Sequence, residues 1–132
     1  MEAVVEVPSR RILLVDDDSL VLEALRVILE TDGHDVVAAE GGQAGIDAFL
    51  EARTAGDPFQ IVITDLGMPY VDGRKVASAV KSASPETLVL LLTGWGQQLK
   101  DEGDIPPFVD GVSGKPPRIR ELRQMFVASV KR

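Results

Sequence analysis

The chain has 132 residues, about the size of one domain, so we expect one functional unit rather than a catalytic domain joined to an output domain. Its 14 Lys and Arg residues against 21 Asp and Glu give a formal net charge of −7, which disfavours nucleic acid and anionic membrane surfaces as partners. The absence of Cys excludes disulfides and thiolate chemistry, and a single His argues against a zinc site. The longest uncharged stretch, 87–99, falls short of the ~18 residues that cross a bilayer, and we expect a cytoplasmic protein.

Five short apolar runs predict the strands of a sheet: 12–15, 35–39, 61–63, 88–92 and a less regular run, 108–112. The first, third and fourth runs are continuous rather than alternating, which is typical of parallel strands that are covered on both faces. Helical periodicity between the runs indicates a three-layer α/β domain with right-handed crossovers. We expect residues 1–9 to form a flexible leader and 10–132 to form one domain.

The first predicted helix follows Asp18, which can cap it, and ends near Gly33. Its stripe of Val21, Leu25 and Ile28 has helical spacing and is expected to face the core.

Further helices are expected from apolar positions at helical spacing: one around Ile46, Phe49 and Leu50, one around Val76 and Val80, and one from about Arg118 with Ile119, Leu122, Phe126 and Val130 facing inward. Between the fourth and fifth strands, the Gly and Pro residues of 94–107 leave room for a short turn at 97–102 at most. A fourth helix at this position would therefore be short or degraded.

Two segments outside these elements have both a functional and a structural interpretation. His34 lies in the polar stretch 32–35, and we interpret it as a solvated turn residue rather than a phosphohistidine. The glycine-rich segment 41–45 lacks the full spacing of a dinucleotide-binding or phosphate-binding loop, so we interpret it as a turn followed by the start of a helix.

Polar side chains stand where the predicted strands end: Asp16 and Asp17 after the first, Asp65 after the third, Thr93 after the fourth and Lys115 just beyond the fifth. In parallel sheets of this kind the ligand site lies beyond the carboxyl ends of the strands. Carboxylates brought together there repel one another, and a divalent cation relieves the repulsion. With oxygen ligands the cation would be Mg²⁺ or Mn²⁺, and because such an ion prefers one or two carboxylates plus a phosphate oxygen, the pattern indicates phosphoryl transfer.

Four motifs resemble the receiver domain of two-component response regulators: ILLVDD at 12–17, IVITDLGMPYVDG at 61–73, LLTG at 91–94 and GKP at 114–116. They occur in that family's order and spacing, and the resemblance covers about residues 10–130. It implies a flavodoxin-like, doubly wound, five-stranded parallel sheet in the order 2-1-3-4-5, forming a single receiver domain at 10–132. It also implies a signalling domain that catalyses its own phosphorylation and dephosphorylation and is not otherwise an enzyme.

The resemblance implies a role for each residue at the strand ends. Asp65 matches the phosphoacceptor, a nucleophile that attacks phosphorus in line. In the Mg²⁺ site, Asp17 matches the direct ligand and Asp16 the partner that acts largely through metal-bound water. Asp65 and the backbone carbonyl of Gly67 complete the site. Thr93 and Lys115 match the hydroxyl and the cation that contact the phosphoryl group and report its presence. The implied donor is a phosphohistidine on a sensor histidine kinase or a histidine phosphotransfer domain, and the downstream protein target stays open.

Three residues near these motifs qualify the resemblance. Pro116 resembles the family's cis-proline, which would aim Lys115 inward. Val112 stands where many receivers carry a rotating aromatic switch residue, so the aromatic relay is absent. Trp95 follows Thr93 by two positions, which motivates the hypothesis that it leans over the phosphoryl site and restricts attacking water.

Two alternatives from other functional classes stay open at this point. The first is a small Mg²⁺-dependent phosphohydrolase of the haloacid-dehalogenase type with Asp16 as its nucleophile. Leu20 stands where that motif wants Thr or Val, and the chain lacks room for a substrate-recognising cap. The second is a docking module that has the receiver fold and works without phosphorylation, against which the intact set of acidic residues argues.

Overall fold

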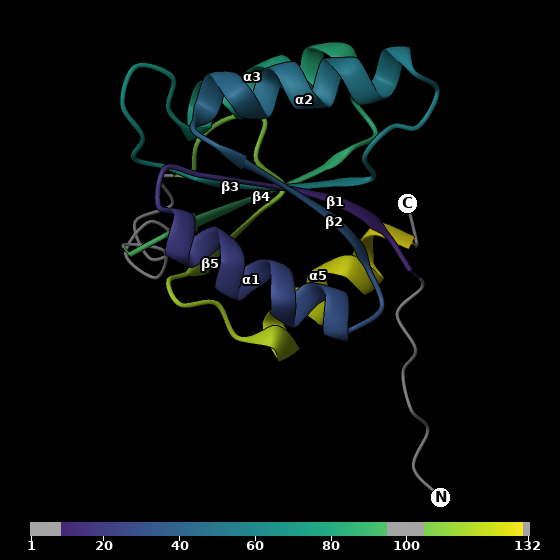
Figure 1. Ribbon diagram of the computed structural model, residues 1–132, viewed down its shortest axis with the longest axis vertical. Coiled ribbons are helices and arrows are strands. Elements are labelled where there is room, and N and C mark those ends of the chain that lie inside the picture. Colours follow the sequence, from purple (N-terminus) through teal and green to yellow (C-terminus); the bar gives the residue numbers. More distant parts are fainter. Residues whose placement is uncertain (1–8, 95–104, 131–132) are drawn as a thin grey trace, which may run out of the picture.

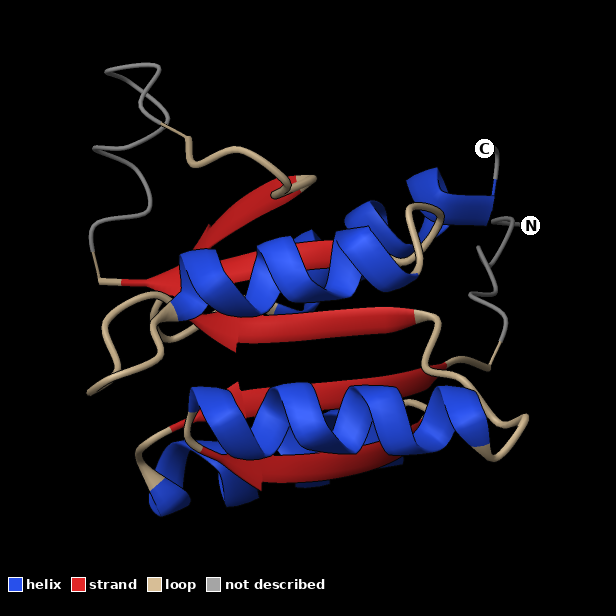
Figure 2. Cartoon of the chain, turned by 90° about the horizontal axis from the view of Figure 1, so that it is seen from above, coloured by secondary structure: helices blue, strands red, loops and turns tan. Residues whose placement is uncertain are grey.

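The computed structural model describes residues 9–94 and 105–130 of the chain, with side chains described as far as residue 127. Its elements are β1 (Arg11–Asp16), α1 (Ser19–Thr31), β2 (Asp35–Glu40), α2 (Gly42–Thr54), β3 (Ile61–Asp65), α3 (Gly73–Ala83), β4 (Leu88–Thr93), β5 (Gly111–Gly114) and α5 (Ile119–Val130). The strands form one sheet in the order β2-β1-β3-β4-β5 with every neighbouring pair parallel (Figure 2), which confirms the predicted fold class and strand order.

Helices cover both faces of the sheet. Figure 1 shows α2 and α3 on one face and α1 and α5 on the other. Alternate residues of β1 divide between two cores, because successive side chains of a strand point to opposite faces. Ile12 and Leu14 pack with α1 and α5, whereas Leu13 and Val15 pack with α2 and α3. β1, β3 and β4 are buried along nearly their whole length, as their continuous apolar runs predict.

Aspartates begin the helices that follow β1 and β3. Asp18 caps α1, and its Oδ1 accepts a hydrogen bond from the Leu20 N–H at 2.9 Å. Asp72 caps α3, and its Oδ1 accepts from the Arg74 N–H at 3.0 Å. Such caps are each worth about 1 kcal/mol, and here they fix where the chain turns away from the carboxyl edge of the sheet, the edge formed by the strands' carboxyl ends.

The fifth strand begins later than the sequence predicts, at Gly111 instead of residue 108. Phe108 has a φ of 70° and is 53% exposed, so its backbone is not extended. Asp110 donates its N–H to the Val89 carbonyl at 2.8 Å and accepts from the Val89 N–H through its carboxylate, also at 2.8 Å. A side chain thus takes the place of a backbone carbonyl, and the regular strand pairing starts only at Gly111.

The buried face of α1 also differs from the predicted stripe. The helix buries Leu22, Leu25 and Leu29, so the prediction was right for Leu25 alone. Val21 is half-buried and Ile28 is 44% exposed. Both stripes have helical spacing, and periodicity by itself does not choose between them.

The remaining described helices occur where the sequence predicts them. In α2, Phe49 is buried as expected, whereas Leu50 is 42% exposed. In α3, Val76 and Val80 are fully buried. The inward-facing residues of α5 that the structure describes, Ile119, Leu122 and Phe126, pack in the core beside α1.

His34 is buried, so its interpretation as a solvated turn residue was wrong. Its Nδ1 accepts a hydrogen bond from the Arg10 N–H at 3.0 Å. Its ring lies edge-on to Phe126 with 5.3 Å between the ring centroids. Burial lowers the pKa of His34, and a neutral imidazole therefore joins the start of β1, the turn before β2 and α5.

Several expectations fall outside the described residues: most of the leader 1–9, the short fourth helix at 97–102, and the shielding hypothesis for Trp95. Each stays a prediction. Within 9–94 and 105–130, none of the helices combines the length and apolar character needed to span a membrane.

Candidate functional site

Three carboxylates meet at the carboxyl edge of the sheet. Asp16 ends β1, Asp17 follows it, and Asp65 ends β3. One oxygen from each side chain lies within 4.8 Å of the other two. Asp16 is 2% exposed and Asp65 is 9% exposed, whereas Asp17 is open to solvent. The sequence-predicted residues are therefore brought together in a cluster that is accessible from one side.

Lys115 supplies the counter-charge of this cluster. Its Nζ lies 2.6 Å from Asp16 Oδ2 and 3.1 Å from Asp65 Oδ1. The Lys115–Pro116 peptide bond is cis, as the resemblance implies. One ammonium group thus bridges the acidic residues that end two neighbouring strands.

The electrostatics of the cluster follow from burial and from this bridge. Burial raises the pKa of Asp65, Lys115 opposes the rise through its hydrogen bond, and the negative charge of Asp16 adds to it. Burial disfavours the charged form of Lys115, but the hydrogen bonds to Asp16 and Asp65 outweigh burial and raise the pKa of Lys115. The ammonium of Lys115 therefore stays charged beside the two carboxylates.

The loop between β3 and α3, residues 66–72, forms one wall of the site. Gly67 is exposed on this loop, two residues after Asp65. Gly73 ends the loop with its N–H donated to the Leu66 carbonyl at 2.9 Å. A Cβ at Gly73 would lie 2.3 Å from the Asp65 carbonyl oxygen, so only glycine allows α3 to start this close to the strand end.

The fourth and fifth strands place the two remaining predicted residues at the same edge. Thr93 ends β4, is 4% exposed and is paired in register with Gly114. Lys115 follows Gly114 directly. The hydroxyl and the ammonium that the sequence assigns to phosphoryl recognition therefore follow adjacent strands.

Val112 occupies a closed position in β5. It is 1% exposed and packs with Leu66 and Leu91. A valine of this kind has no aromatic ring that could rotate between the core and the surface.

A shallow groove of about 380 Å³ leads away from Lys115 along α1. It is lined mainly by apolar side chains, those of Val21, Ala24, Leu25 and Ile28 on α1, with Lys115, Pro116 and Pro117 on the other wall. Sequence reasoning missed this groove, although its signal was present: the stripe of Val21 and Ile28 was assigned to the core instead.

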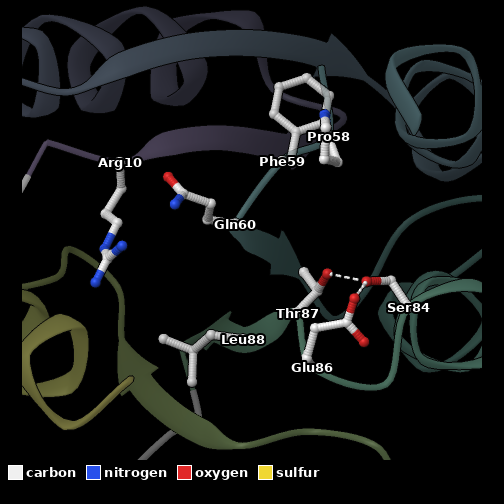
Figure 3. A pocket seen from close by; sticks show the side chains of 8 residues that line it. All are labelled: Arg10, Pro58, Phe59, Gln60, Ser84, Glu86, Thr87 and Leu88. Carbon is white, nitrogen blue, oxygen red and sulfur yellow. Dashed lines mark hydrogen bonds between the residues drawn. The ribbon is translucent and has the colours of Figure 1, made fainter. Parts of the chain in front are cut away.

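A second hollow, of about 280 Å³, lies at the opposite, amino edge of the sheet, near the starts of β1, β3 and β4 (Figure 3). Arg10 and Gln60 lie on one side of it. On the other side, Thr87 donates to Ser84 at 2.7 Å and Ser84 donates to Glu86 at 2.8 Å. The hollow is separate from the acidic cluster and shares no residue with it.

The chain resembles proteins that carry the same arrangement of elements. It is 30% identical to the response regulator MprA of Mycolicibacterium vanbaalenii over 122 residues, which cover 92% of this chain and 51% of MprA. A response regulator receiver domain from Clostridium thermocellum superposes with a TM-score of 0.79 at 26% identity, covering 92% of this chain and 94% of that one. TrrA of Thermotoga maritima, solved in complex with Mg²⁺–BeF, gives a TM-score of 0.75 at 25% identity, covering 91% and 98%.

The chain spans about half the length of MprA and 18% of the Pseudomonas aeruginosa response regulator FleR, so what those whole proteins do is no guide to its output. Neither the phosphohydrolase nor the docking-module alternative gains support from these likenesses. The family model of the response regulator receiver domain matches residues 12–126, and the chain belongs to this family of phosphoacceptor signalling domains.

Proposed function

We propose that this receiver domain accepts a phosphoryl group on Asp65 from a phosphohistidine donor in a Mg²⁺-dependent reaction. The observation that carries the proposal is the cluster of Asp16, Asp17 and Asp65, three carboxylates from two strands with Lys115 bridging two of them. The sequence places each of these residue types at a strand end, and the family is one of phosphoacceptor domains.

The acidic cluster fits a magnesium ion by its chemistry. Its donors are oxygens, and the mutual distance of 4.8 Å or less lets one cation contact the three side chains. We assign the site to Asp16, Asp17, Asp65 and the carbonyl of Gly67. Mn²⁺ could replace Mg²⁺ there, because it also prefers oxygen ligands. When bound, the ion would neutralise charge on the phosphoryl oxygens.

The reaction is a transfer between two nucleophiles. An oxygen of Asp65 attacks phosphorus as the P–N bond of the donor breaks, and the leaving imidazole takes up a proton and becomes neutral histidine. Lys115, held 3.1 Å from Asp65, stabilises the charge that builds on the phosphoryl group. Catalysis of this kind consists mostly of positioning and charge neutralisation.

The phosphoryl group then acts as the signal. It adds roughly −1.5 to −2 charges beside Thr93 and Lys115, and Lys115 must share its hydrogen bonds between the new group and Asp16. Charge-assisted hydrogen bonds contribute roughly 1.5–3 kcal/mol each, and about 5.5 kcal/mol takes a two-state equilibrium from 1:99 to 99:1. Two or three such contacts are therefore enough to drive the change without the aromatic relay that Val112 removes.

We place the protein donor, a sensor histidine kinase or a histidine phosphotransfer domain, in the groove beside Lys115. A donor must bring its histidine in line with Asp65. The apolar groove along α1 is lined at one end by Lys115, which forms the ion pair with Asp65. Exposed apolar side chains beside a polar rim are typical of protein interaction sites.

The test is labelling with radioactive acetyl phosphate in the presence of MgCl₂. We expect label on the wild type, no detectable label on Asp65→Asn, and normal label on Asp47→Asn, because Asp47 is an exposed carboxylate on α2 away from the site. Omission of divalent cation should reduce wild-type labelling to background. Label that persists in Asp65→Asn would overturn the proposal.

A further inference from the structure

The glycine-rich segment at the start of α2 touches both halves of the proposed metal site. One half is Asp16 at the end of β1, and the other is the loop 66–72, which carries Gly67. We propose that the turn formed by Gly41 and Gly42 is a spacer that sets the separation of these two halves, so that both glycines are positioning residues for Mg²⁺. The inference rests on the proposed function but assigns a role to a segment that the function leaves unused.

Gly41 holds the Asp16 side. Its N–H donates to the Asp16 backbone carbonyl at 2.9 Å. Its φ of 99° and ψ of 157° lie in a region that is essentially restricted to glycine. The contact with the strand end therefore depends on a conformation that other residues adopt only under strain.

Gly42 holds the loop side. It is buried, and a Cβ added to it would lie 2.0 Å from the Val71 carbonyl oxygen and 2.8 Å from the Val71 carbonyl carbon. These atoms belong to the backbone of the loop and cannot move aside as a flexible side chain can. The start of α2 and the loop are thus as close as their main chains allow.

The loop itself is held rather than free. Inside it, the Val71 N–H donates to the Pro69 carbonyl at 2.7 Å. The Tyr70 carbonyl accepts from Lys75 Nζ at 3.1 Å, and Tyr70 keeps a φ of 65° although its side chain is 96% exposed. A backbone conformation of this kind persists where the surroundings impose it. A displacement at Val71 should therefore be passed along the loop to Gly67.

Together these contacts form a continuous path from Asp16 through Gly41 and Gly42 to Val71 and the loop. A methyl group at Gly42 must push α2 away from the loop, from Asp16, or from both. Mg²⁺ demands near-octahedral geometry at about 2.0–2.1 Å, so it tolerates such a shift poorly. Groups that only orient metal ligands typically change metal affinity by about 10-fold to 100-fold when they are altered.

The first experiment compares Gly42→Ala with Gly45→Ala by calorimetric titration with MgCl₂. Gly45 lies one turn further along the same helix, and a Cβ there would meet the Val15 side chain at 2.6 Å instead of loop backbone. Both changes crowd the packing of α2 and should lower the melting temperature. We expect the Mg²⁺ dissociation constant to rise about tenfold in Gly42→Ala and to stay within about twofold of wild type in Gly45→Ala.

A second pair keeps the inference testable if Gly42→Ala fails to fold. Gly41 and Gly56 flank α2, have φ values of 99° and 78°, and have nothing within 4 Å of an added Cβ. Gly41→Ala and Gly56→Ala therefore each place a side chain at a positive φ, at opposite ends of one helix. We expect weaker Mg²⁺ binding in Gly41→Ala alone, although both substitutions should lower the melting temperature.

The outcomes separate this inference from the function on which it rests. Wild-type protein that binds no Mg²⁺ overturns both. Wild-type protein that binds Mg²⁺, with dissociation constants in Gly41→Ala and folded Gly42→Ala equal to those of their controls, overturns the spacer alone. Weaker binding that tracks the loss of melting temperature in all four variants also overturns it, because general loosening would then explain the effect.

Discussion

The two edges of the sheet treat charge in opposite ways. At the amino edge, where the strands begin, Arg11 lies 3.0 Å from Asp35 and 3.3 Å from Asp57. Lys81 lies 2.7 Å from Asp110 and also donates to backbone carbonyls of the turn before β4. The charges of Arg11 and Lys81 are matched within the chain, and they connect strand starts to neighbouring turns and helices.

At the carboxyl edge the charges are not matched. Asp16 and Asp65 share the ammonium of Lys115, and Asp17 stands beside them with no ion pair to a described residue. An excess of negative charge in a partly buried cluster costs stability, which a bound cation recovers. The comparison shows that the unmatched negative charge lies at the carboxyl edge, where a bound cation can neutralise it.

The largest expected effect comes from removing the bridge. Lys115→Gln should lower the free energy of unfolding by about 2–3 kcal/mol at pH 7 without divalent cations, because the buried Asp16 carboxylate loses its counter-charge. Arg11→Gln should cost about 1 kcal/mol or less, since its partners Asp35 and Asp57 are 67% and 71% exposed.

Urea denaturation with and without excess MgCl₂ measures both variants. Added Mg²⁺ should shrink the stability difference between Lys115→Gln and wild type measured in the same buffer, and should leave the difference between Arg11→Gln and wild type unchanged. The contrast between the edges would disappear if both variants lost the same free energy of unfolding, or if Mg²⁺ brought both equally close to wild type.

The next effect concerns the groove at the carboxyl edge. Ile28→Asp places a charge on its wall and should slow transfer from a phosphorylated histidine phosphotransfer domain about tenfold, equivalent to about 1.4 kcal/mol. Val27→Asp is the matched control, because Val27 is 51% exposed on the same helix and does not line the groove. Acetyl phosphate is too small to need the groove, so it should label both variants at the wild-type rate. Slower labelling of Ile28→Asp by acetyl phosphate would assign the effect to the site instead.

At the amino edge, His34 should make stability depend on pH. Its pKa is lowered by burial, so the neutral form is favoured in the folded state and the unfolded state binds the proton more readily. The stabilisation is complete at pH values above the ordinary histidine pKa of about 6.5. It is lost as the pH falls through the lowered pKa that His34 has in the folded state. Protonation would also remove the acceptor for the Arg10 N–H and place a cation near Arg10 and Arg123, whose repulsion Asp32 opposes.

Denaturation curves of wild type and His34→Asn between pH 7.5 and pH 5, values chosen to bracket about 6.5, check this expectation. Asparagine keeps an acceptor near the Nδ1 position but does not titrate, so the variant should lose less stability on acidification than wild type. Parallel pH profiles for the two proteins would contradict the assignment.

The smallest effect separates two aromatic residues at positive φ, one at each edge. Tyr70→Asn should raise the free energy of unfolding by about 0.5–1 kcal/mol, because asparagine accepts a left-handed backbone and the 96% exposed tyrosine ring contributes no packing. Phe108→Asn should gain less, since its side chain is 53% exposed, against 96% for Tyr70, and gives up more burial. Thermal denaturation of both variants provides the measurement, and a gain in Phe108→Asn with none in Tyr70→Asn would reverse the reasoning.

Much of the fold could be predicted because its signals are local. The continuous apolar runs of β1, β3 and β4 reflect strands covered on both faces, and the polar residue that ends each run marks the carboxyl edge. Asp16, Asp65 and Thr93 follow from this rule without knowledge of the sheet order. The roles of these residues came from the resemblance to a family and stay proposals.

The features that sequence reasoning missed depend on contacts between distant segments. The start of β5 was misplaced because Asp110 satisfies Val89 with its side chain, which no run of apolar letters reveals. His34 looked solvated because its neighbours are polar, whereas its burial comes from Phe126, far along the chain. The role proposed for Gly42 depends on Val71 in another loop, so its neighbours in the sequence carry no hint of it.

The open turn around Gly56 has a practical consequence for protein engineering. Residues 54–57 are exposed, and the space around an added Cβ at Gly56 is empty. Exposed tips of this kind tolerate insertion best, and this one lies at the end of α2 away from the acidic cluster. A fluorescent reporter inserted between Ala55 and Gly56 would therefore mark the domain while leaving the residues of the acidic cluster untouched.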